Sequence, residues 1–179
     1  STGQWASTIG TYNLSGYDVV LIMLGTNDVQ GGVAVSTVAA NINVILDAVE
    51  AAGAVPVLGV FPVWTQASVS GVVGVSTSNY ARGAAIRAMI RRLAAARNLQ
   101  IADVEAHFGD MGEYGDNIHP NEYGQAVVAK AFASALQRQF GRRTMRYGWK
   151  RAILLNGWTR YNSLHPFPQF GVRDGIVRL

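Results

Sequence analysis

The chain has 179 residues, enough for one domain of ordinary size with a hydrophobic core and a short additional segment. It contains no cysteine, which excludes a disulfide framework, thiolate catalysis and a cysteine-bound metal. No apolar stretch reaches the roughly 18 to 20 residues that a membrane-spanning helix needs, so we expect a soluble protein without a membrane partner.

Charge is distributed unevenly along the chain. Residues 1–139 contain 7 Lys and Arg against 10 Asp and Glu, whereas residues 140–179 contain 8 against 1. A basic segment of this kind can bind nucleic acid or another acidic surface. Its basic residues are irregularly spaced among aromatic ones, which favours a solvated segment or one that packs in an assembly. We therefore expect no nucleic-acid partner, and a change of module near residue 141.

The first part of the chain alternates between buried strands and an amphipathic helix. Residues 17–24 form a continuous apolar run that ends at Gly25, as expected for a strand buried on both faces. Residues 55–61 predict a second strand of the same kind. Between them a helix is predicted over 36–51. The residues of its apolar stripe are Val38, Ile42, Ile45, Leu46 and Val49.

The same alternation continues further along the chain. Residues 62–78 are rich in Gly, Ser and Val and predict a long loop. An amphipathic helix with its arginines facing solvent is predicted over 79–97, a third strand over 99–104, and a last helix over 120–140, beginning near Pro120. This alternation predicts an α/β fold with a parallel sheet that is covered on both faces.

Polar residues directly follow the first predicted strand, in the run GTND at 25–28. In an open parallel sheet, functional groups gather beyond the carboxyl ends of the strands. Asn27 offers a side-chain amide of the kind that stabilises an oxyanion in acyl transfer, and Asp28 is expected to cap the turn that holds it. On its own, an Asn-Asp pair after a strand is more often a turn or a helix cap, so this run alone leaves a structural role open.

A second polar run, DNIHPN at 116–121, lies between the third strand and the last helix. Asp116 is placed to accept a hydrogen bond from one ring nitrogen of His119, which leaves the other nitrogen free to act as a general base. A His-Pro pair before a helix is also common in polar loops. The same two side chains are possible metal ligands, but no third ligand is evident, so we expect no metal and no cofactor. Both runs should meet at one sheet edge, and their conjunction favours a catalytic site.

Two tryptophans and a threonine are candidates for substrate contacts. Trp64 follows the second strand and, together with Trp5, is able to form an aromatic surface of the kind that binds sugars; packing in the protein interior is the alternative interpretation. Thr26 is adjacent to Asn27 and is also expected to contact the substrate.

Residues 17–28, YDVVLIMLGTND, resemble the third conserved block of the SGNH or GDSL-type hydrolases, and residues 116–124, DNIHPNEYG, resemble the fifth. The resemblance implies a three-layer α/β/α, flavodoxin-like fold and the hydrolysis of esters through a serine nucleophile. It implies that Asn27 is an oxyanion donor, His119 the general base and Asp116 its orienting partner. The first five residues, STGQW, are similar to the end of the second block and imply a backbone oxyanion donor at Gly3.

The nucleophile block of that family does not occur in this chain. The sequence contains no Gly-Asp-Ser, and the order of the blocks implies that it precedes Ser1. The sequence also starts without an initiator Met or a signal-like segment, so we expect the hydrolase-like domain, residues 1–140, to lack its first strand. Because a bare sheet edge needs a partner, an upstream segment or another chain is expected to complete the sheet and the site.

Residues 141–179 predict a short, basic, β-rich segment that begins another module. The run AILLNGWT at 152–159 contains a strand-like stretch, and Asp174-Gly175 predicts a turn before a β-branched run. This segment resembles β-rich modules near the ends of bacteriophage tail and fibre proteins. The resemblance implies a part of a phage tail assembly, located outside the cell or on the virion.

Two functions are compatible with these features. The first is a carboxylic ester hydrolase, such as an acetylesterase, acting on an acylated small molecule or on a bacterial surface glycan. The second is a non-catalytic structural or glycan-binding module of a virion protein that keeps the fold without the nucleophile. The joint presence of Asn27, Asp116 and His119 favours the enzyme, because a purely structural domain has no physical need for all three.

Overall fold

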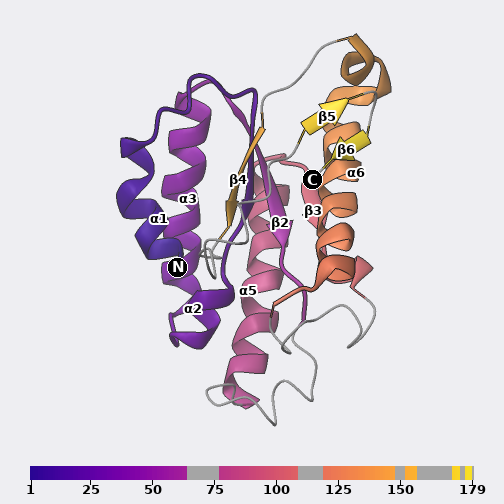
Figure 1. Cartoon of the computed structure of the whole chain (residues 1–179). Helices are drawn as coiled ribbons and strands as arrows, with labels where there is room; N and C mark the ends of the chain where they lie inside the picture. The colour runs from indigo at the N-terminus through magenta and orange to yellow at the C-terminus, as the bar shows by residue number, and fades with distance from the viewer. Residues whose placement is uncertain (64–76, 109–118, 148–151, 157–170, 174–175, 179) are drawn as a thin grey trace, which may run out of the picture.

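The computed structural model describes residues 1–63, 77–108, 119–147, 152–156, 171–173 and 176–178, with side chains as far as residue 141 (Figure 1). The first elements are α1 (Thr2–Thr8), a 3₁₀ turn (Ile9–Thr11), β1 (Val19–Met23), α2 (Thr26–Gln30), α3 (Val35–Ala51) and β2 (Val55–Val60). They are followed by α5 (Thr77–Ala96), β3 (Ile101–Asp103), a second 3₁₀ turn (Glu105–His107), α6 (Glu122–Tyr147), β4 (Ala152–Asn156), β5 (Gly171–Arg173) and β6 (Ile176–Arg178).

The main sheet has four parallel strands in the order β3-β2-β1-β4. In its centre, Leu21 lies opposite Val57 of β2 on one side and Leu154 of β4 on the other. The three strands predicted at 17–24, 55–61 and 99–104 are confirmed as β1, β2 and β3. Strand β4 occupies the edge of β1 that we expected to be bare, while β5 and β6 pair antiparallel as a separate ribbon.

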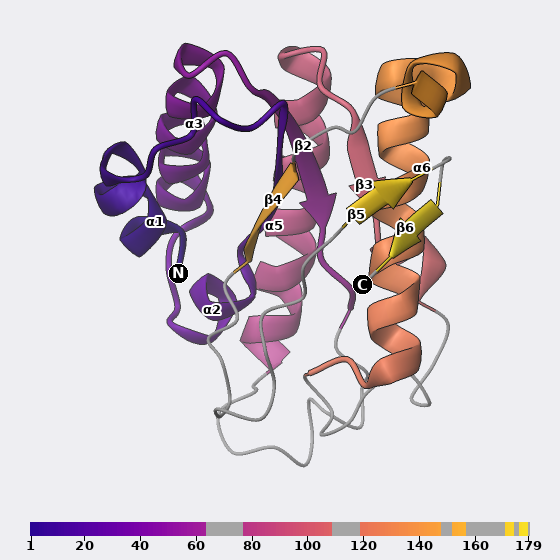
Figure 2. The ribbon, with the colours of Figure 1, turned by 45° about the horizontal axis from the view of Figure 1, so that its top comes forward.

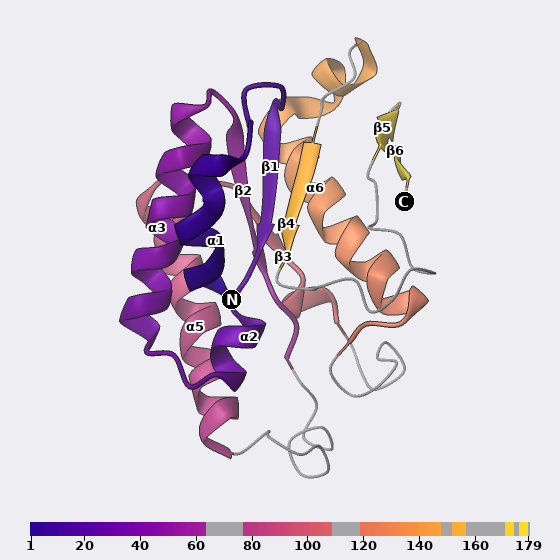
Figure 3. The same cartoon turned by 60° about the vertical axis from the view of Figure 1, so that its left-hand side comes forward.

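Helices lie on both faces of the main sheet. Helices α1, α3 and α5 form a layer on one face, and α6 lies on the other, against β2 and β3 (Figure 3). The view in Figure 2 shows the sheet between these two helical layers. The expected three-layer α/β/α architecture is therefore confirmed. None of the helices in the described part of the chain has both the length and the apolar character needed to cross a membrane.

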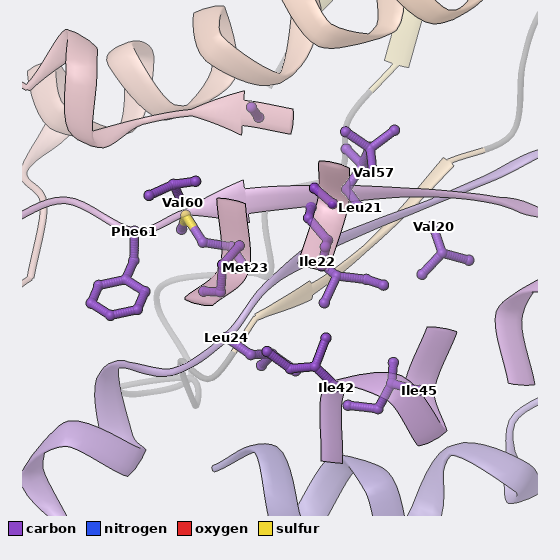
Figure 4. Packing of buried hydrophobic residues seen from close by; sticks show 14 of the residues in the cluster. Val20, Leu21, Ile22, Met23, Leu24, Ile42, Ile45, Val57, Val60 and Phe61 are labelled. Carbon is purple, nitrogen blue, oxygen red and sulfur yellow. The ribbon is translucent and has the colours of Figure 1, made fainter. Parts of the chain in front are cut away.

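Burial on both faces explains the sequence of the central strand. All five residues of β1 are buried, and the apolar stripe predicted for α3 packs onto them (Figure 4). In the close-up, Ile42 and Ile45 of α3 lie beside Ile22 and Leu24. A strand covered on both sides needs apolar residues at every position rather than at alternate ones, which is the pattern in this chain.

The opposite layer requires one close approach. A Cβ atom at Gly59 of β2 would lie 2.7 Å from the ring tip of Phe132 of α6 and 3.0 Å from Cβ of Met23. Phe132 is itself fully buried. Glycine at this position therefore lets α6 sit directly on the sheet.

The last helix differs from its prediction at both ends. It begins at Glu122 rather than near Pro120, because the side chain of Asn121 accepts hydrogen bonds from the amides of Tyr123 and Gly124 and so acts as its cap. It continues to Tyr147, but Gly141 interrupts it with φ 68° and ψ 156°. This break coincides with the predicted module boundary, although the boundary itself stays a prediction.

The arginines of α5 were predicted to face solvent, and this is wrong for Arg87. Its side chain is buried, and Nε lies 2.7 Å from Oε1 of Glu105. The guanidinium also lies over the ring of Phe61, 5.4 Å from its centroid. The helical period alone placed Arg87 among polar positions, whereas its partner is the half-buried Glu105 in the 3₁₀ turn after β3.

Candidate active site

The carboxyl ends of the parallel strands meet at one edge of the molecule. There β1 leads into α2, and β3 leads into the second 3₁₀ turn, while α6 starts at the same edge (Figure 1). The N-terminus of the chain lies next to α2 at this edge. The predicted positions Gly3, Asn27 and His119 are therefore all carried by segments at the end of the sheet where functional groups are expected.

Gly25 makes the turn from β1 into α2. Its φ of 123° lies in a region that residues with a side chain rarely adopt, and an added Cβ would be 2.7 Å from Cε1 of Phe61. The helix α2 starts at the next residue and is only five residues long. The run GTND therefore forms a helix start rather than an open turn, and its direction depends on glycine at 25.

Asn27 is exposed, whereas the two residues that follow it are buried. Asp28 is 1% exposed and Val29 is 0% exposed. Thr26, the first residue of α2, is half-buried. In a helix, successive side chains point about 100° apart, so burial of Asp28 and Val29 leaves Asn27 on the outer side of α2.

We expected Asp28 to cap its own turn. Instead, its carboxylate binds Thr2 at the start of α1. Its Oδ1 and Oδ2 accept hydrogen bonds from the backbone amide of Thr2 at 3.1 and 2.9 Å, and Oδ1 accepts a third from the Thr2 hydroxyl at 2.7 Å. Thr2 Oγ1 in turn accepts a hydrogen bond from Nδ2 of Asn41 at 3.1 Å. This buried network, Thr2–Asp28–Asn41, joins α1, α2 and α3.

The network joins the segment of the predicted backbone donor to the segment of the predicted side-chain donor. Gly3 is the residue after Thr2, it is exposed, and it lies in the first turn of α1. The first amides of a helix have no partner within the helix. Gly3 directly follows Thr2, and Asn27 directly precedes Asp28. Each predicted donor is therefore adjacent to one member of the buried, hydrogen-bonded pair.

A contact on the other side of α2 also fixes its position. The carbonyl of Val29 accepts a hydrogen bond from Nη1 of Arg82 in α5 at 3.2 Å, and the same nitrogen donates to Oδ1 of Asn79 at 2.6 Å. Arg82 is therefore not simply a solvent-facing residue of α5. With Asp28 on one side and Arg82 on the other, this short helix is bound to both of its helical neighbours.

His119 lies at the edge immediately before α6. It is exposed, and it is followed by the buried Pro120 and by Asn121, which caps the helix. Its predicted partner Asp116 and the predicted sugar-binding residue Trp64 are outside the described residues. Trp5 is half-buried and packs against Tyr12, with ring centroids 5.4 Å apart. Within the described ranges, no three His, Asp or Glu side chains form a metal-binding group.

A cluster of ion pairs supports the end of β3, from which the chain continues toward the second polar run. Arg91 Nη2 lies 2.7 Å from Oδ1 of Asp103 and 2.6 Å from Oε2 of Glu105, which also binds Arg87. Desolvation by burial lowers the pKa of Arg91, but its hydrogen bonds to Asp103 and Glu105 and their charges outweigh this effect, so the pKa is raised. Arg91 therefore stays charged and keeps α5 bound to this end of β3.

The role of Thr2 was not predicted from the sequence, and the role predicted for Asp28, as a cap of its own turn, is wrong. Both residues could be seen as polar residues beside predicted oxyanion donors. What was not visible is that residues 26 positions apart in the chain bind each other, because nothing in a single sequence pairs a particular hydroxyl with a particular carboxylate.

The fold defines a class of protein: three-layer α/β/α domains with a parallel sheet, in which functional groups gather beyond the carboxyl ends of the strands. Residues 2–127 match the model of the GDSL-like lipase/acylhydrolase family. Because this match covers most of the chain, the chain belongs to that family. It is accordingly a hydrolase of the esterase type.

Solved structures show the same fold at low sequence identity. LAE5, an alpha/beta hydrolase enzyme from the metagenome of Lake Arreo, Spain, is 19% identical with a TM-score of 0.61, covering 75% of this chain and 67% of its own. A member of the lipolytic G-D-S-L family from Veillonella parvula is 16% identical with a TM-score of 0.62, covering 77% and 75%. A catalytic mutant of Axe2, an acetylxylan esterase from Geobacillus stearothermophilus, is 16% identical with a TM-score of 0.62, covering 76% and 67%. No curated protein sequence matches the chain.

Proposed function

We propose that this chain forms most of a serine esterase domain that removes acetyl or other short acyl groups from a glycan, with the nucleophilic serine supplied by a segment upstream of Ser1. Asn27 and the amide of Gly3 are the oxyanion donors, His119 is the general base and Asp116 orients it. The observation that carries the proposal is the hydrogen-bonded pair Thr2–Asp28, which holds the segments of the two donors together.

In the proposed reaction, the serine hydroxyl attacks the ester carbonyl while His119 takes its proton. The carbonyl oxygen becomes negatively charged and is stabilised by Asn27 and the Gly3 amide. His119 then returns the proton to the leaving alcohol, and an acyl-serine remains. Water attacks this acyl group by the same route in reverse, which releases the acid and restores the serine.

The choice of a glycan rests on two supports. One of the similar structures is that of an acetylxylan esterase, so the fold accommodates deacetylation of a polysaccharide. The second support is the resemblance of residues 141–179 to phage tail modules: on a virion, the domain would meet a surface glycan of a bacterium. Asn27 and His119 are both exposed, as contact with a large substrate would require.

The test is covalent labelling with a fluorophosphonate probe, which reacts with activated serines. Intact mass and peptide mapping are compared for residues 1–179 and for the longer parent chain. We expect labelling of the parent at an upstream serine and none on residues 1–179. Labelling at a serine within residues 1–179 would contradict the assignment of the nucleophile, and absence of labelling in both would favour a non-catalytic glycan-binding module.

Substitutions in the parent test the proposed roles. Asn27→Ala should lower kcat for an acetyl ester by about 100-fold or more, the usual effect of removing one oxyanion donor. His119→Gln should abolish both turnover and labelling. The matched controls are Gln30→Ala, an exposed position of the same helix, and His107→Gln, an exposed histidine in the second 3₁₀ turn. Both controls should hydrolyse the ester at the rate of the unsubstituted protein.

A further inference from the structure

Asp28 is a buried carboxylate next to Asn27 that the proposed reaction does not use. It is 1% exposed, and in the described part of the structure its carboxylate accepts hydrogen bonds from Thr2 and from no arginine or lysine. A buried carboxylate is costly unless it is well hydrogen-bonded. Glycine, alanine or a small apolar residue would avoid this cost, so the carboxylate needs a reason beyond filling space.

We infer that Asp28 is a positioning residue that sets the separation of the two oxyanion donors, by binding the α1 segment that carries Gly3 to the α2 helix that carries Asn27. This inference rests on the proposed function. It adds a residue that acts on the reaction through others: Asp28 is buried and its carboxylate binds Thr2, whereas Asn27 and Gly3 are exposed.

The geometry of the contact makes it directional. The backbone amide of Thr2 points at both carboxylate oxygens, at 3.1 and 2.9 Å, and the hydroxyl of the same residue adds a shorter bond of 2.7 Å to Oδ1. Hydrogen bonds to an ionised carboxylate are about twice as strong as neutral ones. Two donors from one residue fix the orientation of Thr2 as well as its distance, and the peptide plane after Thr2 is the one that ends in the Gly3 amide.

Both ends of this contact are anchored independently. Thr2 is held from α3 by Asn41, and α2 is held from α5 by Arg82 and by the fully buried side chain of Val29. A change at Asp28 therefore does not release either segment completely. It removes the contact that relates one segment to the other, and a displacement of about 1 Å at a reacting group can cost about 100-fold in rate.

The main test substitutes Asp28→Asn in the full-length parent. The amide keeps the size of the side chain but replaces one acceptor oxygen by a donor that faces the Thr2 amide. We expect kcat for an acetyl ester to fall by about 100-fold with KM changed less than about threefold. Affinity for an alkyl boronic acid, whose serine adduct carries a negative oxygen in the place of the oxyanion, should fall in parallel with kcat/KM. Affinity for the product alcohol, which makes no oxyanion contact, should stay the same.

A double substitution separates positioning from a general loss of structure. If Asp28 acts through the donors, Asp28→Asn should cost much less in the Asn27→Ala background than in the unsubstituted protein, below about tenfold, because one of the two donors is already absent. Additive losses would mean that Asp28 acts elsewhere and would overturn the inference. Asp47→Asn, at an exposed carboxylate of α3, is the matched control and should leave kcat unchanged.

Substitutions of Thr2 keep the test decisive if Asp28→Asn does not fold. Thr2→Ser retains both hydrogen-bond donors and should keep kcat within about twofold, whereas Thr2→Val loses only the hydroxyl and should lower kcat by about tenfold. Equal activity of the two variants would overturn the inference.

The outcomes separate the inference from the proposed function. If Asn27→Ala and His119→Gln show their expected losses but Asp28→Asn behaves like Asp47→Asn, the inference is wrong and the proposed function stands. If the parent neither hydrolyses esters nor reacts with the fluorophosphonate, both are wrong.

Discussion

At the scale of single residues, the turn at the end of β1 shows how strongly one position can constrain a site. Gly25 has a positive φ, and a Cβ atom at this position would clash with the ring of Phe61. Phe61 in turn lies under the guanidinium of Arg87. If the ring moved away from Gly25, it would disturb its contact with Arg87, which is itself paired with Glu105. The position of Asn27 therefore depends on glycine at residue 25.

Gly25→Ala should destabilise the protein more than a change of backbone preference alone would. The positive φ costs about 1 to 3 kcal/mol, and overpacking against Phe61 adds about 1 to 3 kcal/mol. Urea unfolding followed by circular dichroism would measure the loss. Gly32→Ala is the matched control, because Gly32 also has a positive φ, of 70°, but nothing lies within 4 Å of its added Cβ. If the two variants lose equal free energy of unfolding, the contact with Phe61 has no energetic effect.

At the scale of elements, short segments are fixed by side-chain contacts and long ones by burial. The five-residue α2 is too short to be stable by itself. Its position depends on the bonds from Thr2 and Arg82. The 17-residue α3, by contrast, packs a full apolar stripe onto β1. This difference explains why α3 was predicted from its periodicity and α2 was not.

The ion pair between α5 and the end of β3 gives a prediction at this scale. Arg87→Met should lower the free energy of unfolding by about 2 kcal/mol, because it leaves the carboxylate of Glu105 with one partner fewer in a partly buried place. Arg91 still binds Glu105, which limits the loss. Thermal or urea unfolding would measure it.

Two further variants serve as comparisons for Arg87→Met. Arg92→Met, at an exposed position of the same helix, should stay within about 0.5 kcal/mol of the unsubstituted protein. Adding Glu105→Gln to Arg87→Met should recover part of the loss, because the side chain that has lost one of its two cationic partners is then uncharged. An Arg87→Met variant that is as stable as Arg92→Met would show that the buried pair has no net stabilising effect.

At the scale of the whole molecule, the outer edge of β1 decides how the sheet is completed. In this chain β4 pairs with that edge along its whole length, from Val19 opposite Ala152 to Met23 opposite Asn156. In our proposal, a segment upstream of Ser1 carries the nucleophile to the same edge of the sheet. In the first arrangement the stability of the sheet depends on β4, and in the second it does not.

Proline substitutions in β4 test that dependence. Successive amides of an edge strand point alternately toward and away from the sheet, so one of Ile153→Pro and Leu154→Pro removes a hydrogen bond to β1 and the other does not. In residues 1–179, one variant should lower Tm clearly more than the other. In the parent chain, both should leave Tm nearly unchanged if an upstream strand occupies this edge. Equal Tm values for both variants and the unsubstituted chain of 179 residues would show that β4 contributes nothing to its stability.

Much of the architecture could be predicted from sequence, because burial on both faces leaves a strong pattern. The apolar runs at β1 and β2 and the stripe of α3 are consequences of hydrophobic burial, which depends on residue type and period alone. The starts of α1 and α2 were not predicted, since neither helix has enough residues to show a period. Arg87 was misplaced because its ionic partner, Glu105, lies 18 residues away in the chain.

The sequence by itself determined the fold class, the family and the identity of the candidate site residues Asn27 and His119, because these depend on local runs whose residue types are specific. Tertiary structure alone decided what those residues are bound to: that Asp28 faces the start of α1 rather than its own turn, that Arg82 holds α2, and that Arg87 is buried. The physical reason is that hydrogen bonds and ion pairs join particular atoms at distances of about 3 Å. Such pairings arise only after hydrophobic burial has brought distant segments together.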